Sequence, residues 1–231
     1  MSEVRPLGEK VEWGGAKVPA KEPLEGRTVV LRPLDVDRDV EALFRESHEP
    51  DGDPEIWDYL FEGPFDDVEE MRALLVPAAA GDDPIFFAIE PRDLGVAAGQ
   101  CTYMRIDAPM GSIEIGNIWF GPRLRRTTAA TEAIYLLARH AFRDLGYRRF
   151  EWKCNALNAP SRRAAERFGF TFEGIFRQHI VVKGRNRDTA WYSIVDSEWP
   201  RIEAGFETFL DPGNFDAEGR QRRPLSELIA D

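Results

Sequence analysis

WFGPRLRRTTAATEA (residues 119–133) is the stretch where the hydrophobic pattern of this chain changes from strand to helix. The preceding residues, 111–120, form a β-like apolar run that ends at the turn residues Gly121-Pro122. The following apolar residues recur at helical spacing, which predicts an amphipathic helix over 127–145 with Gly146 as its C-cap. A strand, a basic turn and a long helix therefore form the most informative unit of the sequence.

The start of this helix has the properties of an anion site. Its first backbone N–H groups lack intrahelical partners and lie at the positive end of the helix dipole, so they can hold a phosphate. Small side chains allow close approach, and arginines and hydroxyls add donors: the candidate residues are Arg125, Arg126, Thr127, Thr128, Ala129, Ala130 and Thr131. A basic helix start is also common as a solvated surface feature, so this pattern alone assigns no function.

The chain before this unit alternates between strand and helix signals. The β-branched run 28–34 predicts a strand, and Asp35 is a suitable N-cap for the helix that follows. Further helix is predicted within 56–61 and 66–81. The runs 85–90, 95–107 and 111–120, separated by turn residues, predict an antiparallel meander.

The chain after the long helix returns to strands. Residues 148–154 predict a strand and 158–169 a short helix, with Pro160 in its first turn. Residues 171–183 and 188–196 predict a β-hairpin with a polar tip, followed by another helix. We therefore expect one α+β domain over residues 27–210, an irregular N-terminal arm over 1–26 that Trp13 pins to the body, and a polar C-terminal tail over 211–231.

Composition excludes several classes of protein. The 231 residues are 43% hydrophobic and include 15 Phe and 6 Trp, which is too apolar for a disordered chain. The net charge of −11 opposes broad binding to nucleic acid or anionic lipid. No membrane span or secretion signal is visible, so a cytoplasmic location is the default expectation. Cys101 and Cys154 are expected to be buried, reduced thiols, and no metal site is expected.

Several short motifs occur together in a defined order. They are Thr131-Glu132-Ala133, Asn158-Ala-Pro-Ser161, Glu166-Arg-Phe-Gly169-Phe170 and Gly184-Arg-Asn-Arg-Asp188. In this order, over about residues 27–200, the chain resembles the GNAT superfamily of acetyl-CoA-dependent N-acetyltransferases. Its closest likeness is to the branch with the ribosomal-protein N-terminal (alanine/serine) acetyltransferases.

The resemblance implies a fold and a cofactor site. The expected fold is a mixed, largely antiparallel splayed sheet with helices on both faces, whose central strands diverge around residues 119 and 154. The pantetheine arm of acetyl-CoA is expected between strands 112–120 and 148–155, against backbone groups of Trp119 and Phe120, whose rings can still be core. In the family's pyrophosphate motif Arg125 takes the first place and Ala130 the last, but Thr128 stands where Gly is usual.

The resemblance also implies roles at the reacting centre. Asn158 is expected to bind the cofactor arm and Ser161 to protonate the departing thiolate, and helix capping is the alternative for both. Glu114 or His179, through water, is the candidate proton acceptor; the alternatives are a carboxylate paired with an arginine and a structural histidine. The carboxylate proposed as base in the ribosomal branch has no counterpart, because Ile180 occupies its place.

The predicted function is acetyl-CoA-dependent acetylation of a primary amine, which is a small molecule or a protein or peptide N-terminus. The alternative is a non-catalytic CoA-binding or protein-interaction module on the same fold. The acceptor cleft is expected between helices in 35–75 and the hairpin 176–192, where Arg185 and Arg187 are candidates for a substrate carboxylate or a cofactor phosphate, or are solvated. Neither nucleic acid nor membrane is expected as a partner, and a homodimer is left open.

Overall fold

The computed structural model describes residues 5, 7–48 and 50–230. Within these residues the strands form one eight-stranded sheet in the order β1-β2-β3-β4-β5-β6-β8-β7. Every neighbouring pair is antiparallel except β5 and β6, which are parallel, so the sheet is mixed and largely antiparallel as predicted. The strands are β1 Leu24–Glu25, β2 Val29–Pro33, β3 Ile85–Pro91, β4 Gly99–Asp107, β5 Ser112–Phe120, β6 Arg149–Asn155, β7 Thr171–Val182 and β8 Arg185–Val195.

The central strands diverge, which positions the site. Pairing of β5 with β6 runs from Ser112–Arg149 to Ile115–Trp152, and in the described chain it goes no further. The register of β4 against β5 shifts between Gln100 and Thr102, and Asn117 opposite this shift has a φ of 47°. A bulge of this kind bends a strand, so β5 leaves β6 at this point. The predicted divergence around residues 119 and 154 is confirmed, and it begins just after Ile115 and Trp152.

The helices begin where the sequence supplies caps. The side chains of Asp35, Asp67, Thr127 and Asn158 accept N-terminal backbone bonds of α1, α2, α3 and α4. The helical elements are α1 Val36–Ser47, η1 Pro54–Tyr59, α2 Val68–Ala80, α3 Thr128–Arg139, η2 His140–Asp144, α4 Ala159–Arg167, α5 Trp199–Leu210, η3 Pro212–Asn214 and α6 Leu225–Ala230. The predicted helix 127–145 is thus α3 followed by one π turn, η2, and the helix predicted within 56–61 is the end of a 3₁₀ turn.

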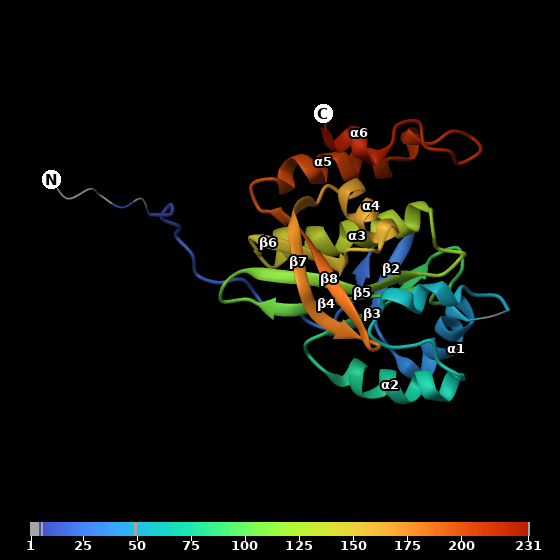
Figure 1. Ribbon diagram of the computed structural model, residues 1–231. Helices are drawn as coiled ribbons and strands as arrows, with labels where there is room; N and C mark the ends of the chain where they lie inside the picture. Colours follow the sequence, from blue (N-terminus) through green and yellow to red (C-terminus); the bar gives the residue numbers. More distant parts are fainter. Residues whose placement is uncertain (1–4, 6, 49, 231) are drawn as a thin grey trace.

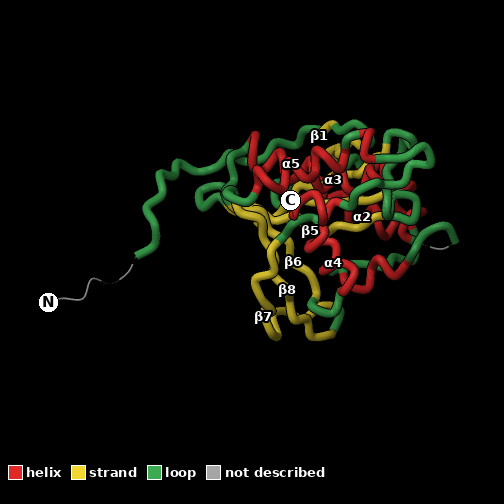
Figure 2. Tube along the Cα trace, turned by 90° about the horizontal axis from the view of Figure 1, so that it is seen from above, coloured by secondary structure: helices red, strands yellow, loops and turns green. Residues whose placement is uncertain are grey.

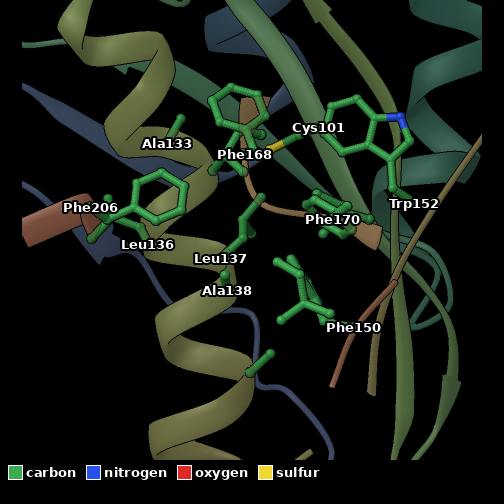
Figure 3. Packing of buried hydrophobic residues seen from close by; sticks show 14 of the residues in the cluster. Cys101, Ala133, Leu136, Leu137, Ala138, Phe150, Trp152, Phe168, Phe170 and Phe206 are labelled. Atoms are coloured by element: carbon green, nitrogen blue, oxygen red, sulfur yellow. The ribbon is translucent and has the colours of Figure 1, made fainter. Parts of the chain in front are cut away.

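Helices cover both faces of the sheet and create two cores. The larger core lies against α3, α5 and α6, and the smaller one against α1 and α2 on the other face (Figure 1). Phe87 and Ala88, neighbours on β3, lie in different cores because successive side chains of a strand point to opposite faces. Figure 3 shows Leu137 of α3, Phe150 of β6 and Phe206 of α5 in the larger core.

The two ends of the chain differ from each other. The N-terminal arm extends away from the body (Figure 2), and Trp13 fixes its inner part by donating to the carbonyl of Pro109 at 2.6 Å. The C-terminal segment, expected to be a polar tail, instead forms α6, whose Leu225, Leu228 and Ile229 are buried against α5. Among the described residues, no helix is both long and apolar enough to cross a membrane.

Candidate active site

A small cavity, here called the fork cavity, lies where β5 and β6 separate. Its volume is about 100 Å³, and its wall comes from β4, β5, β6, the start of α4, residues 56–61 and the hairpin of β7 and β8. The predicted Glu114, Asn158, Ser161 and His179 all line it. Four candidate residues from three separate parts of the sequence therefore share one cavity.

Glu114 is a buried carboxylate held by two cations. Its Oε2 accepts from Nη1 of Arg105 at 2.7 Å and from Nζ of Lys153 at 2.8 Å, and its side chain is 3% exposed. Lys153 also donates to Glu151 at 2.6 Å. Because one oxygen accepts from two cations, Glu114 is a fixed charge in the cavity wall. This is the pairing with an arginine that the sequence analysis gave as the alternative to a proton acceptor.

Ser161 and Asn158 begin α4 in different ways. Oδ1 of Asn158 accepts the backbone N–H of Ser161 at 3.0 Å, so Asn158 is the N-cap of the helix. Oγ of Ser161 accepts the indole N–H of Trp152 at 3.0 Å. Since that oxygen is an acceptor toward Trp152, its own proton points elsewhere and is available as a donor. Burial raises the pKa of the neighbouring Cys154 thiol, and the Ser161 hydroxyl, which can donate toward that sulfur, opposes this rise.

His179 has one ring nitrogen fixed and the other open. Nδ1 lies 3.0 Å from Oγ1 of the buried Thr189, and the ring packs edge-on to Phe176. Within the described chain, Nε2 has no hydrogen-bond partner, so it can meet a water or a substrate. The imidazole thus combines a defined orientation with a free nitrogen at the cavity.

A second cavity, the helix-start cavity, lies beside the first turn of α3. It measures about 760 Å³ and lies between α3, the second half of α4 and residues 215–221. Six of the predicted cofactor residues line it: Phe120, Arg126, Thr127, Thr128, Ala130 and Thr131. Ala129 lines a neighbouring cavity of about 420 Å³, together with Thr127 and Thr128.

The backbone at the start of α3 offers specific donors. The N–H groups of Arg125, Thr127 and Ala130 are already bonded to Gly121 O, Leu124 O and Thr127 Oγ1. In the described residues this leaves the N–H groups of Arg126, Thr128 and Ala129 without an acceptor, at the positive end of the helix. Arg126 has a φ of 62°, whereas Thr128 is ordinary helix, so its position does not require a glycine conformation.

The two cavities follow the same two elements. Along β5, Ile118 lines the fork cavity and Phe120 the helix-start cavity; along α4, the corresponding residues are Ser161 and Ala164. A molecule with an anionic end and an extended arm can therefore bind along β5 and α4, with its anionic end at the start of α3 and its arm in the fork cavity.

Comparison with known proteins assigns the family. Residues 28–171 match the family described as the acetyltransferase (GNAT) domain. The chain belongs to the GNAT family of acetyltransferases. The crystal structure of a GCN5-related N-acetyltransferase from Brucella melitensis superposes with a TM-score of 0.92 at 47% identity, covering 95% of this chain and 99% of that one.

Two curated GNAT relatives are more distant. A Bacillus licheniformis protein, named the uncharacterized N-acetyltransferase p20, is 28% identical over 155 residues, 64% of this chain and 84% of its own length. Bacillus subtilis YdaF, named as a candidate ribosomal N-acetyltransferase, is 30% identical over 105 residues, 46% of this chain and 57% of its own length. These matches confirm the predicted family, fold and enzyme class, and acetyl-CoA is the acetyl donor that the family uses.

Two predicted cofactor residues of this GNAT chain, Arg125 and Trp119, line none of these three cavities. Arg125 forms an ion pair with Asp53 and donates through Nε to the carbonyl of Phe120 at 3.0 Å, and its hydrogen bond lowers the pKa of Asp53. The ring of Trp119 is buried in the smaller core beside Trp57, which is the core position that the sequence analysis allowed for it. In the described structure neither side chain lines the helix-start cavity. The next residue after Arg125, Arg126, does line it.

Three cavity residues were missed by sequence reasoning or read differently. Asn117 lies at the bulge of β5 and lines the fork cavity. The only sequence signal for this was an asparagine within a β-like run. Lys153 is buried beside Glu114, although lysines in strands are usually solvated. Arg187, expected at an exposed hairpin tip, is 7% exposed and lines the fork cavity. The available signal for its inward position was strand alternation, which places Arg187 on the same face of β8 as the buried Thr189.

The described residues contain no group of three or more His, Cys, Asp or Glu placed to hold a metal ion. Cys101 and Cys154 are both buried and not disulfide-bonded, as predicted. Burial raises the pKa of the Cys101 thiol far above its ordinary value, so it is an inert core residue.

Proposed function

We propose that this GNAT acetyltransferase transfers the acetyl group of acetyl-CoA to a primary amine by direct attack in the fork cavity. The observation that carries the proposal is the meeting of Ser161, His179 and Glu114 where β5 and β6 separate. The acceptor is a small amine or a protein or peptide N-terminus, and the name of the Bacillus subtilis relative lends support to the second.

The start of α3 fits the pyrophosphate of acetyl-CoA. The open N–H groups of Arg126, Thr128 and Ala129 are suited to phosphate oxygens, and Arg126 and Arg167 add positive charge to the same cavity. The cap of α4 uses only the oxygen of Asn158, so its amide N–H groups are left for the cofactor arm. Acetyl-CoA, when bound, supplies the thioester carbonyl for attack and a sulfur leaving group.

Protons move through side chains that face the fork cavity. His179 accepts the amine proton through water at Nε2, while Nδ1 is held by Thr189. Ser161 gives its proton to the departing thiolate as the C–N bond forms and the C–S bond breaks. Glu114 stays paired with Arg105 and Lys153, and is the second candidate for the proton acceptor.

The acceptor enters between residues 56–61 and the β7–β8 hairpin, where Nζ of Lys183 donates to the carbonyl of Trp57 at 2.7 Å. The acidic residues of this region do not line the fork cavity, and two of them are caps: Asp53 for η1 and Asp67 for α2. Their attraction for a cationic amine is therefore at the approach to the cavity rather than inside it.

The test combines binding and turnover. We expect acetyl-CoA to bind in a calorimetric titration, and thiol release to rise with at least one member of a panel of amines, polyamines, aminoglycosides and N-terminal peptides. His179→Ala is expected to change the pH–rate profile, whereas Glu114→Gln is expected to preserve its shape. If Glu114→Gln changes the pH–rate profile and His179→Ala preserves it, then Glu114 is the proton acceptor.

The competing proposal is a module that binds CoA without transfer. It has one observation in its favour, because Thr128 places a side chain where the family usually has Gly. Binding of acetyl-CoA without thiol release on the whole panel would select this alternative. The absence of binding would contradict both proposals.

A further inference from the structure

Arg187 is a buried cation to which the described residues offer no anionic partner. It lies on β8, is 7% exposed, and its Nε is sealed from solvent with no acceptor. Among the described residues no side chain forms an ion pair with it, and its only close contact of this type is the ring of Phe61, 5.2 Å from Cζ. The other two cations of the fork cavity, Arg105 and Lys153, are both paired with Glu114.

This arrangement is unfavourable in the free protein. Nε loses its hydration and gains no hydrogen bond, and the ring of Phe61 and the more distant charge of Glu114 compensate for this only in part. Burial accordingly lowers the pKa of Arg187, but a guanidinium remains protonated in proteins. The fork cavity therefore contains a positive charge that an anion would stabilise.

The location decides which anion is suitable. The phosphates of acetyl-CoA are expected in the helix-start cavity, and no residue lines both that cavity and the fork cavity. The fork cavity, at about 100 Å³, is small, and the planar fork of an arginine matches a carboxylate through two parallel N–H···O bonds. The anion therefore belongs with the acceptor rather than with the cofactor.

We propose that Arg187 binds a carboxylate of the acetyl acceptor, so that the preferred acceptors are amines that also carry a carboxylate. This inference rests on the proposed function. The carboxylate is the α-carboxylate of a free amino acid or the acidic side chain near a peptide N-terminus. A cation at this place also disfavours a second positive charge nearby, and thus favours the neutral amine that attack requires.

The test compares acceptors that differ only in the carboxylate. Glycine and β-alanine are paired with their amides, and the amidated peptide Ser-Asp-Ala with Ser-Asn-Ala, each with acetyl-CoA and a thiol readout. For at least one source we expect kcat/KM to be roughly 10- to 100-fold higher with the carboxylate. The two arms separate a free amino acid from a peptide.

Arg187→Met is expected to abolish that preference without lowering the melting temperature, because it removes an unpaired buried charge and keeps the length of the side chain. Arg187→Lys is expected to keep part of the preference. The matched control is Arg185→Met, two residues away on the same strand but exposed and outside the cavity, which should keep all of it. A purely structural Arg187 would instead lower the melting temperature and leave the preference intact.

Binding is measured as well, so that the two proposals fail separately. N-acetylglycine and its amide are titrated into wild type and Arg187→Met by calorimetry. Turnover of amines without preference for a carboxylate in either arm would overturn the role of Arg187 alone. If no amine is acetylated, the proposed function fails. The carboxylate site is then tested by binding alone: N-acetylglycine should bind more tightly than its amide, and Arg187→Met should remove this difference.

Discussion

Ser161 and Asn158 lie three residues apart, yet their side chains make different contacts. Asn158 caps α4, so its oxygen is used within the backbone. Ser161 takes no part in capping and receives the indole N–H of Trp152 instead. At the scale of single residues, Asn158 therefore takes the capping role, and the hydroxyl of Ser161 is left for the proton donation that we propose.

Ser161→Ala is expected to lower kcat by roughly 10²-fold or more while leaving the affinity for acetyl-CoA nearly unchanged, because only proton donation is removed. Asn158→Ala is expected to lower the free energy of unfolding by about 0.5–2 kcal/mol through loss of the cap. Steady-state kinetics, acetyl-CoA titration and thermal melts of both variants check this. Unchanged kcat in Ser161→Ala would remove the proposed proton donor.

At the scale of elements, the end of α1 supports one wall of the fork cavity. His48, just after α1, stacks on Phe44 with ring centroids 4.1 Å apart and accepts the backbone N–H of Phe65 at Nε2. Its ring also lies beside Trp57 of η1. A neutral imidazole therefore joins α1 to the segment before α2 and to η1.

Acid is expected to weaken this junction. Burial lowers the pKa of His48 below its ordinary value of 6.5, so below that pH the unfolded chain binds more protons than the folded one. Stability is therefore complete above 6.5 and falls as the pH drops toward the folded pKa. His140, which is half-buried and whose pKa desolvation also lowers, contributes with the same sign.

Melting temperatures of wild type and His48→Gln across this range check the prediction. We expect the variant to be less stable at neutral pH and to lose less stability on acidification, because glutamine keeps an acceptor but does not titrate. Parallel curves for the two proteins would show that His48 makes no contribution to the pH dependence.

At the scale of the whole molecule, the last residues complete the larger core. Leu225 of α6 is fully buried, and a Cβ added at Gly205 of α5 would lie 2.7 Å from Cγ1 of Ile229, so the two helices are in close contact. The same segment supplies Phe215 and Arg220 to the helix-start cavity. The C-terminal region therefore belongs to the folded body.

Leu225→Ala is expected to lower the free energy of unfolding by about 2–5 kcal/mol, because it leaves a cavity in a packed core. Leu7→Ala is the matched control, since Leu7 in the N-terminal arm is 92% exposed. Denaturant unfolding of both variants checks this. Equal stability of the two would mean that α6 is not part of the cooperative core.

The sequence by itself determined the strand–turn–helix unit, most element positions, the caps Asp35 and Asn158 and the order of motifs that indicates the GNAT family. These are local properties: periodicity and capping depend on residues within a few positions of one another. The site residues could be named for the same reason, since Asn158, Ser161 and the start of α3 lie in recognisable local patterns.

Only the tertiary structure decided what those residues face. Glu114 is paired because β4 and β6 bring Arg105 and Lys153 to it. Arg187 is buried in a fold that places the ring of Phe61 over its guanidinium. The polar segment after Asp211 packs because three buried apolar residues outweigh its polar composition. Burial and pairing depend on contacts between residues distant in sequence, and no local pattern contains them.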